Sequence, residues 1–272
     1  MKVLLLLSTL AFLFVSTGCP GGVGSDTARQ EETAVSPALD GNSIVSEFLK
    51  RDAAPMRRSK ARLTVEQEDG KTQTYVLEAF RRQTEAETRT FTRVIEPQDD
   101  SDIASLTIER PGEPAVNVTY VATQGRFRET GTGKMFFGGL TTQELLGEWD
   151  KYSSELLSEK TVEGRKMYEV ESTLKEGRDS VIYRIVTLFD AETYLPTKLE
   201  LFNSTGKLLR TFEVEATAEF DGRPAVSKTV ITNHIHRTKI TVEQLELEQS
   251  IEPDPAMFEK EFLKTRLSGP QE

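Results

Sequence analysis

The chain has 272 residues, of which 37% are hydrophobic and 29% are charged, proportions that are ordinary for a folded soluble domain. Its formal net charge of −10 argues against a nucleic acid as partner, because phosphate binding needs a basic surface. The single cysteine, Cys19, excludes a disulfide within the chain.

Residues 1–18 have the pattern of a signal peptide, with Lys2 as the charged start and an apolar run after it. That run is shorter than the roughly 20 apolar residues of a membrane span. Small residues precede Cys19, which resembles a bacterial lipobox, although Ser16 stands where an aliphatic residue is usual. The alternative is an ordinary secretory leader with a chance cysteine.

Residues 19–40 are predicted to be a lipidated cysteine and a flexible linker, because they lack apolar periodicity and are rich in Gly, Pro, Ser and Thr. An acylated Cys19 would hold the protein on its membrane, since each buried CH₂ contributes about 0.8 kcal/mol. The resemblance to a lipobox implies a lipid-anchored protein on the periplasmic side of the bacterial cell envelope. We expect the outer membrane rather than the inner one, although Pro20 after Cys19 does not settle this choice.

A helix is predicted at residues 41–52, where Asn42 or Ser43 can cap the start and Pro55 ends the pattern. Its apolar stripe consists of Ile44, Val45, Phe48 and Leu49. The chain then changes to β-like alternation from Met56 onward.

The first hairpin is predicted at Asp69-Gly70, because this dipeptide favours a two-residue type I′ turn. Such a turn sets Val65 opposite Thr74 and Leu63 opposite Val76. Further strands follow, and one of them contains Phe91.

The stretch before residue 150 is rich in aromatic side chains and glycine. Thr141 and Glu144 have the spacing of a capping box, which predicts a short helix after the Phe-Phe-Gly-Gly run. Phe136, Phe137 and Trp149 are candidate lid or cavity residues, and their alternative role is simply to fill a core.

Three β-rich runs between Val181 and Ala216 predict an antiparallel meander. Leu199 and Leu201 alternate with charged residues, so one face of their strand is expected to meet a core and the other to meet water. Phe212 lies on the apolar phase of the next strand.

The two histidines, His234 and His236, are spaced to share a face of a strand as a metal pair, but no third ligand lies nearby in the sequence. After them, a change of apolar phase predicts a β-bulge near Glu243-Gln244. Asp254 and Pro255 predict a final short helix, with residues 268–272 as a disordered tail.

Several short motifs occur in a characteristic order. Gly-Arg-x-Arg at residues 125–128 precedes Phe-x-Gly at 136–138 and the short acidic helix. A strand then ends at Asp190, its turn ends in Tyr-Leu-Pro at 194–196, and a hairpin with Gly206-Lys207 follows. This order resembles the LolA-like family of bacterial outer-membrane lipoprotein-sorting proteins.

The resemblance implies an α+β, mainly β fold for residues 41–267: a curved, unclosed, barrel-like antiparallel sheet with helices covering its concave face. An acyl chain of a lipoprotein or lipid would occupy the apolar space between them. The cavity residues expected on this basis are Phe48, Phe91, Phe136, Phe137, Trp149, Leu199, Leu201 and Phe212.

No catalytic motif, metal-ligand spacing or phosphate-binding glycine loop is present in the sequence, so neither an enzyme nor a cofactor is expected. The predicted function is acyl-chain binding in outer-membrane lipoprotein or lipid transfer. An envelope transporter is a candidate partner. Binding by apolar burial alone would be broad in headgroup. The alternative is a non-catalytic accessory or scaffold lipoprotein with a filled core.

Overall fold

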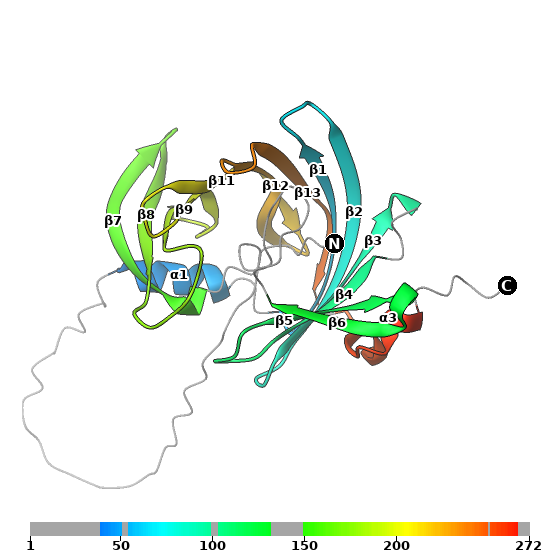
Figure 1. Ribbon diagram of the computed structural model, residues 1–272. Helices are drawn as coiled ribbons and strands as arrows, with labels where there is room; N and C mark the ends of the chain where they lie inside the picture. Colours follow the sequence, from blue (N-terminus) through cyan, green and yellow to red (C-terminus); the bar gives the residue numbers. More distant parts are fainter. Residues whose placement is uncertain (1–38, 51–53, 99–102, 132–148, 250, 266–272) are drawn as a thin grey trace, which may run out of the picture.

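The computed structural model describes residues 39–50, 54–98, 103–131, 149–249 and 251–265 (Figure 1). Their strands form one antiparallel sheet, in the order β6-β5-β4-β3-β2-β1-β13-β12-β11-β10-β9-β8-β7. The strands are β1 (Met56–Glu66), β2 (Thr72–Gln83), β3 (Thr88–Glu96), β4 (Ala104–Glu109), β5 (Val116–Val121), β6 (Arg126–Gly131), β7 (Tyr152–Val162), β8 (Arg165–Leu174), β9 (Arg184–Asp190), β10 (Pro196–Phe202), β11 (Leu208–Phe220), β12 (Arg223–Asn233) and β13 (Thr238–Gln249).

Short helices complete the described structure. They are α1 (Gly41–Lys50), η2 (Ala122–Gln124), η4 (Trp149–Lys151), η5 (Pro255–Phe258) and α3 (Phe262–Thr265). In the described part of the chain, no helix is long and apolar enough to cross a membrane. The predicted helix that begins near Thr141 lies outside the described residues.

The sheet consists of two meanders, β1–β6 and β7–β13, joined where β1 pairs with β13. Strands β6 and β7 are its two edges and are not paired with each other, so the sheet does not close into a barrel. The prediction of a mainly β fold with an unclosed antiparallel sheet is therefore confirmed.

The register of the first hairpin differs from the prediction by one residue. Val65 pairs with Gln73, and Leu63 pairs with Tyr75. The turn is wider than a two-residue type I′ turn, because Gln67 N–H bonds to the Lys71 carbonyl at 2.9 Å. Gly70 takes the left-handed conformation that ends such a three-residue turn.

The predicted meander around residues 181–216 is confirmed as β9, β10 and β11. Leu199 and Leu201 point to the same face as Phe212, with which Leu199 pairs across the strands. The predicted bulge in β13 is also present, since Lys60 pairs with Glu246 and Ala61 with Gln244.

One face of the sheet, called here the inner face, carries a single apolar cluster that includes α1. The cluster joins Leu63 of β1, Ile240 of β13 and Val170 of β8 to Phe48 of the helix. Strands so far apart in the sheet order share one cluster only if the sheet curves around this face. The inner face is therefore the concave one.

The opposite, outer face carries a second apolar cluster under the C-terminal segment. Phe91, Leu106 and Val118 pack there against Phe258 and Leu263. Phe91 pairs with Phe80, whereas the inner-face pair in the same strands is Leu77 with Val94. The expectation that helices cover the concave face is thus not confirmed for α3, which lies on the outer face beside β4–β6 (Figure 1).

The start of α1 is attached to the edge strand β7. Asp40, and not the predicted Asn42 or Ser43, caps the helix, because its carboxylate accepts from Ser43 N–H at 2.7 Å. The Asn42 side chain accepts instead from Ser154 N–H in β7 at 3.0 Å. Gly41 lies against the same strand: a Cβ there would be 2.5 Å from the backbone nitrogen of Glu155.

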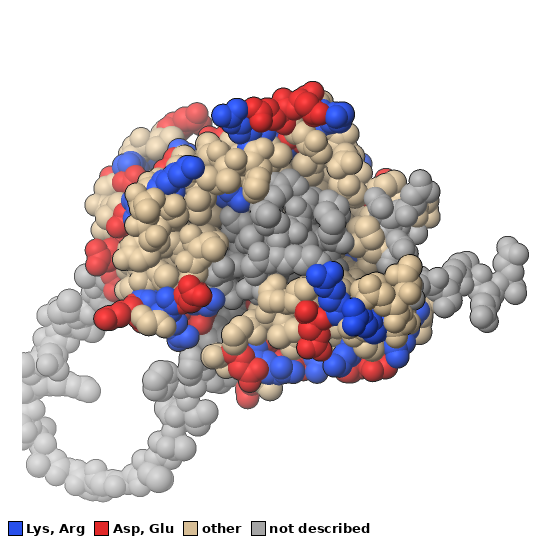
Figure 2. Space-filling view, in the orientation of Figure 1, with Lys and Arg blue, Asp and Glu red and all other residues tan. Residues whose placement is uncertain are grey.

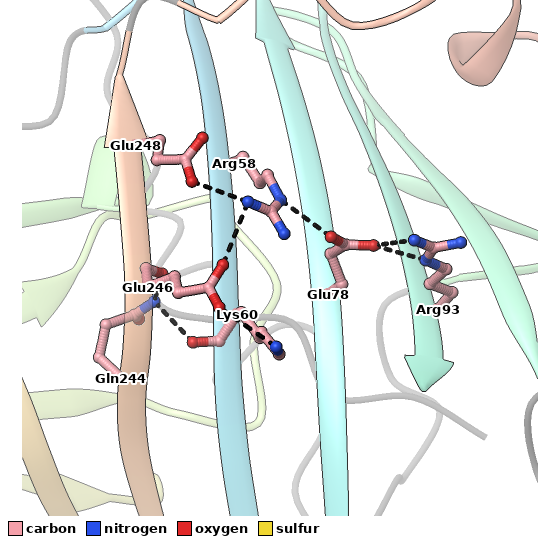
Figure 3. A network of polar contacts seen from close by, with 7 residues as sticks. All are labelled: Arg58, Lys60, Glu78, Arg93, Gln244, Glu246 and Glu248. Atoms are coloured by element: carbon pink, nitrogen blue, oxygen red, sulfur yellow. Dashed lines mark hydrogen bonds and ion pairs between the residues drawn. The ribbon is translucent and has the colours of Figure 1, made fainter. Parts of the chain in front are cut away.

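Charged side chains join four strands on the outer face (Figure 3). Glu78 is buried and accepts from Arg58 Nε at 2.8 Å and from Arg93 Nε at 2.5 Å. Arg58 also reaches Glu248 at 2.7 Å, and Glu246 binds both Arg58 and Lys60. The hydrogen bond to Glu78 raises the pKa of Arg58, which keeps the guanidinium charged.

Asp190, where β9 ends, organises the turn into β10. One carboxylate oxygen accepts from Thr193 N–H at 2.8 Å and from Glu192 N–H at 3.1 Å, while Arg165 lies 3.3 Å from the other. Burial alone would raise the pKa of Asp190, but the bonds from Thr193 and Glu192 and the charge of Arg165 lower it overall.

We expect Asp190→Asn to lower the free energy of unfolding at pH 7 by roughly 2 kcal/mol, the size of a charged hydrogen bond. A lowered folded pKa stabilises the protein above the unfolded pKa of about 3.9, and this stabilisation disappears as pH falls through the folded value. The difference in free energy of unfolding between the wild type and the variant should therefore be smaller in urea unfolding at pH 3. A deficit that stays constant with pH would contradict this role of the charge.

Candidate functional site

On the inner face, apolar side chains pack beside α1 into one buried cluster. Phe48 meets the edge of Trp149, with ring centroids 6.0 Å apart, and lies 5.6 Å from the ring of Phe189. Leu199, Leu201 and other aliphatic side chains continue the cluster across the sheet. Contacts of this kind rest on apolar burial and are not directional.

The structure brings together five of the sequence-predicted cavity residues and separates a sixth. The five in the inner-face cluster are Phe48, Trp149, Leu199, Leu201 and Phe212. Phe91 lies on the outer face instead, against Phe262, with ring centroids 5.4 Å apart. Phe136 and Phe137 lie outside the described residues, as does Cys19.

Beyond Leu77 and Val94, the inner face of β1–β6 changes from apolar to polar. Thr92 pairs with Ser105, and Thr90 pairs with Thr107, so their side chains share this face. Two arginines also share it, since Arg57 pairs with Arg81 and Arg81 with Thr90. These side chains are all buried.

Three of the buried hydroxyls have no hydrogen-bond partner: Thr90, Thr92 and Ser105. Their neighbour Thr107 does have one, because it accepts from the Asn117 amide at 2.8 Å. A buried polar group without a partner costs about 1–3 kcal/mol. Three adjacent buried hydroxyls without partners on a single face therefore need a physical explanation.

Arginines also mark the open edge of this polar region. Arg126 and Arg128 of β6 pair with Val121 and Thr119, which places them on the inner face. Both are exposed, and neither forms an ion pair with any described residue. Figure 2 shows basic side chains, with acidic ones beside them, where Figure 1 places β6.

The two histidines lie in the turn between β12 and β13, so they do not form the pair on one strand face that a metal site would need. His234 Nε2 is 2.9 Å from Thr211 Oγ1, and the turn is held by the Asn233 side chain, which accepts from His236 N–H. Among the residues that the structure describes, no group of three His, Cys, Asp or Glu could hold a metal ion.

A family model described as that of an uncharacterized protein matches residues 86–265 of the chain. No curated protein matches the sequence of this chain. Several solved structures do share its fold, with sequence identities below 20%.

A DUF1329 family protein from Desulfovibrio piger superposes with a TM-score of 0.73 at 17% identity, covering 81% of this chain and 95% of that one. An outer-membrane lipoprotein-sorting protein domain from Vibrio parahaemolyticus gives 0.73 at 18% identity, covering 82% and 98%. A LolA superfamily protein from Nitrosomonas europaea gives 0.67 at 13% identity, covering 83% and 100%. The fold expected from the LolA-like motifs is therefore confirmed.

Proposed function

Because the chain belongs to the uncharacterized-protein family whose model matches residues 86–265, and has the LolA-like fold, we propose that it binds acyl chains on the apolar part of its inner face. The observation that carries the proposal is the single inner-face cluster, in which distant strands and α1 turn apolar side chains toward one another. Acyl chains are recognised by such burial and need few polar contacts.

The proposal includes a membrane anchor at Cys19 and a position on the periplasmic side of the envelope. The lipobox-like sequence before Cys19 supports the anchor, and the outer-membrane lipoprotein-sorting name of one structure with this fold supports the compartment. An anchored protein would act over a short range, passing lipoproteins or lipids to or from an envelope transporter. The competing function is an accessory subunit with a filled core.

Native mass spectrometry of the chain, purified without detergent and followed by lipid extraction, tests the proposal directly. We expect a bound mass that matches an acyl lipid at near-stoichiometric level. An apo mass alone, even after incubation with fatty acid, would favour the accessory role, and crosslinking in the envelope would then identify the protein partner.

Trp149 provides an internal reporter of acyl-chain position, because it is the only tryptophan in the chain and belongs to the inner-face cluster. We expect a fatty acid brominated in mid-chain to quench its fluorescence, since bromine quenches on contact, and the unbrominated acid to leave it unchanged.

The matched control moves the reporter to the other face. In the double variant Trp149→Phe, Phe262→Trp the tryptophan would lie in the outer-face cluster and should not be quenched by the brominated acid. Equal quenching in both proteins would mean that the acid binds without regard to the inner face, and the proposed site would be wrong.

A further inference from the structure

Two rows of polar side chains cross the inner face from the open edge strand toward its middle. They follow from the pairing of β3 with β4 and of β5 with β6. One row is Thr92, Ser105, Thr119 and Arg128, and the other is Thr90, Thr107, Asn117 and Thr130. The first row runs from the exposed Arg128 to the buried hydroxyls of Ser105 and Thr92.

The inner ends of these rows adjoin the apolar surface. Thr92 is two residues from Val94, which belongs to the inner-face apolar cluster. Residues two apart on a strand are about 7 Å from each other on the same face. A ligand with one apolar and one polar part could therefore contact both regions without a break.

The polar rows are suited to donate hydrogen bonds. Thr92 and Ser105 are at most 2% exposed and have no partner, so the hydrogen-bonding capacity of their buried hydroxyls is unused. Arg128 supplies a guanidinium without an ion-pair partner among the described residues, and Arg126 donates to the neutral Gln124 at 2.7 Å. Phosphate, with several acceptor oxygens and negative charge, is complementary to this set.

The carboxylate on this face lies apart from the proposed position of the phosphate. Glu109 shares the face of Ser105 but is four residues further along β4, about 13 Å away. Repulsion between the carboxylate and a phosphate near Ser105 and Arg128 is correspondingly small.

We propose that these rows bind the phosphate headgroup of an anionic phospholipid whose acyl chain lies on the apolar part of the inner face. The inference rests on the proposed acyl-chain binding and makes it specific, because an apolar surface alone would not distinguish headgroups. The buried hydroxyls without partners and the arginines at the open edge are the features that a filled, purely structural core would not require.

The test compares two ligands that differ only in the phosphate. Lauroyl lysophosphatidic acid and monolaurin share one acyl chain and glycerol, and both are titrated below their aggregation limits into the full chain by isothermal calorimetry. We expect the phosphate-bearing lipid to bind at least tenfold more tightly. Equal affinities would overturn the headgroup site and leave acyl binding intact, whereas failure of both to bind would remove the proposed function itself.

Two variants address the hydroxyls and the arginine separately. Thr92→Val with Ser105→Ala, and Arg128→Gln alone, should each reduce the preference for the phosphate-bearing lipid at least threefold while monolaurin affinity stays the same. Removing hydroxyls without partners should not lower the melting temperature, and Arg128 is exposed, so folding is preserved in at least one of the variants. An unchanged preference in the folded variants would contradict the site.

Matched controls carry the same chemical change elsewhere. Thr187 has a buried hydroxyl without a partner and lies next to Val170 and Leu199 of the apolar cluster, so Thr187→Val should keep the preference. Arg62→Gln, on the outer face, should also keep it. Displacement of the phosphate-bearing lipid by millimolar inorganic phosphate would show that the anion alone is bound, and would overturn a phospholipid as the occupant.

Discussion

Replacing Glu78 by alanine is expected to lower the free energy of unfolding by about 3–5 kcal/mol, the cost of removing one partner from a buried charge pair. Glu78 is 4% exposed and is held between Arg58 and Arg93 from the two neighbouring strands. Without it Arg58 keeps its glutamates on β13, but Arg93 loses the carboxylate to which it is bonded (Figure 3). Urea unfolding at pH 7 measures the loss.

The matched control is Glu243→Ala on the same face. Glu243 pairs with Arg62 at 3.2 Å, but the two side chains are 37% and 45% exposed, and pairs open to solvent contribute about 0–1 kcal/mol. Comparable losses in the two variants would mean that burial of Glu78 does not govern the strength of its network.

This network explains why the outer face of β1–β3 is polar while the inner face is apolar near α1. Arg58, Lys60 and Arg62 alternate along β1 with side chains that point inward, such as Ala61 and Leu63. The ion pairs link β13, β1, β2 and β3, the strands at which the two meanders meet. Charge on this face thereby stabilises the junction of the sheet.

Alternation in the sequence predicted the strands well where one face is apolar and the other charged, as at Leu199, Leu201 and Phe212. The same alternation gave no information about which face is concave. The sequence therefore groups Phe91 with the cavity residues, whereas in the structure its neighbours Thr90 and Thr92 point inward.

Sequence reasoning missed the polar rows for a related reason. Threonine and serine between apolar residues are the usual pattern of a strand with a solvent-facing side. Only the return of the C-terminal segment, with Phe258 and Leu263, shows that the apolar side of β3–β5 is covered from outside. That contact joins residues more than 130 positions apart, and no local pattern encodes it.

The geometry of the first turn also could not be predicted from the sequence. Asp69-Gly70 indicated a hairpin correctly, but the dipeptide fits both a two-residue turn and a three-residue turn that ends at the glycine. The difference of one residue changes which side of β2 faces inward. It brought Tyr75 to the inner face in place of Val76, the residue predicted opposite Leu63.

The second large effect is expected at Gly41, where a methyl group should dislodge the start of α1. A Cβ at this position would lie 2.5 Å from the backbone of Glu155 and 2.6 Å from that of Ser154, closer than real contacts allow. Backbone atoms of a paired strand cannot yield as a flexible side chain would. We expect Gly41→Ala to lower the free energy of unfolding by about 3 kcal/mol, at the upper end for overpacking.

The structural change caused by Gly41→Ala should extend from the start of α1 to the inner face. Displacing α1 would break the bond from Ser154 N–H to Asn42 and move Phe48 away from Trp149, so the fluorescence of that tryptophan should shift to the red. Gly131→Ala is the control, because nothing lies within 4 Å of a Cβ there, and its stability should change by no more than about 0.5 kcal/mol. If Gly41→Ala kept both stability and emission, α1 would not depend on its close contact with β7, and the inner face would owe its shape to the sheet alone.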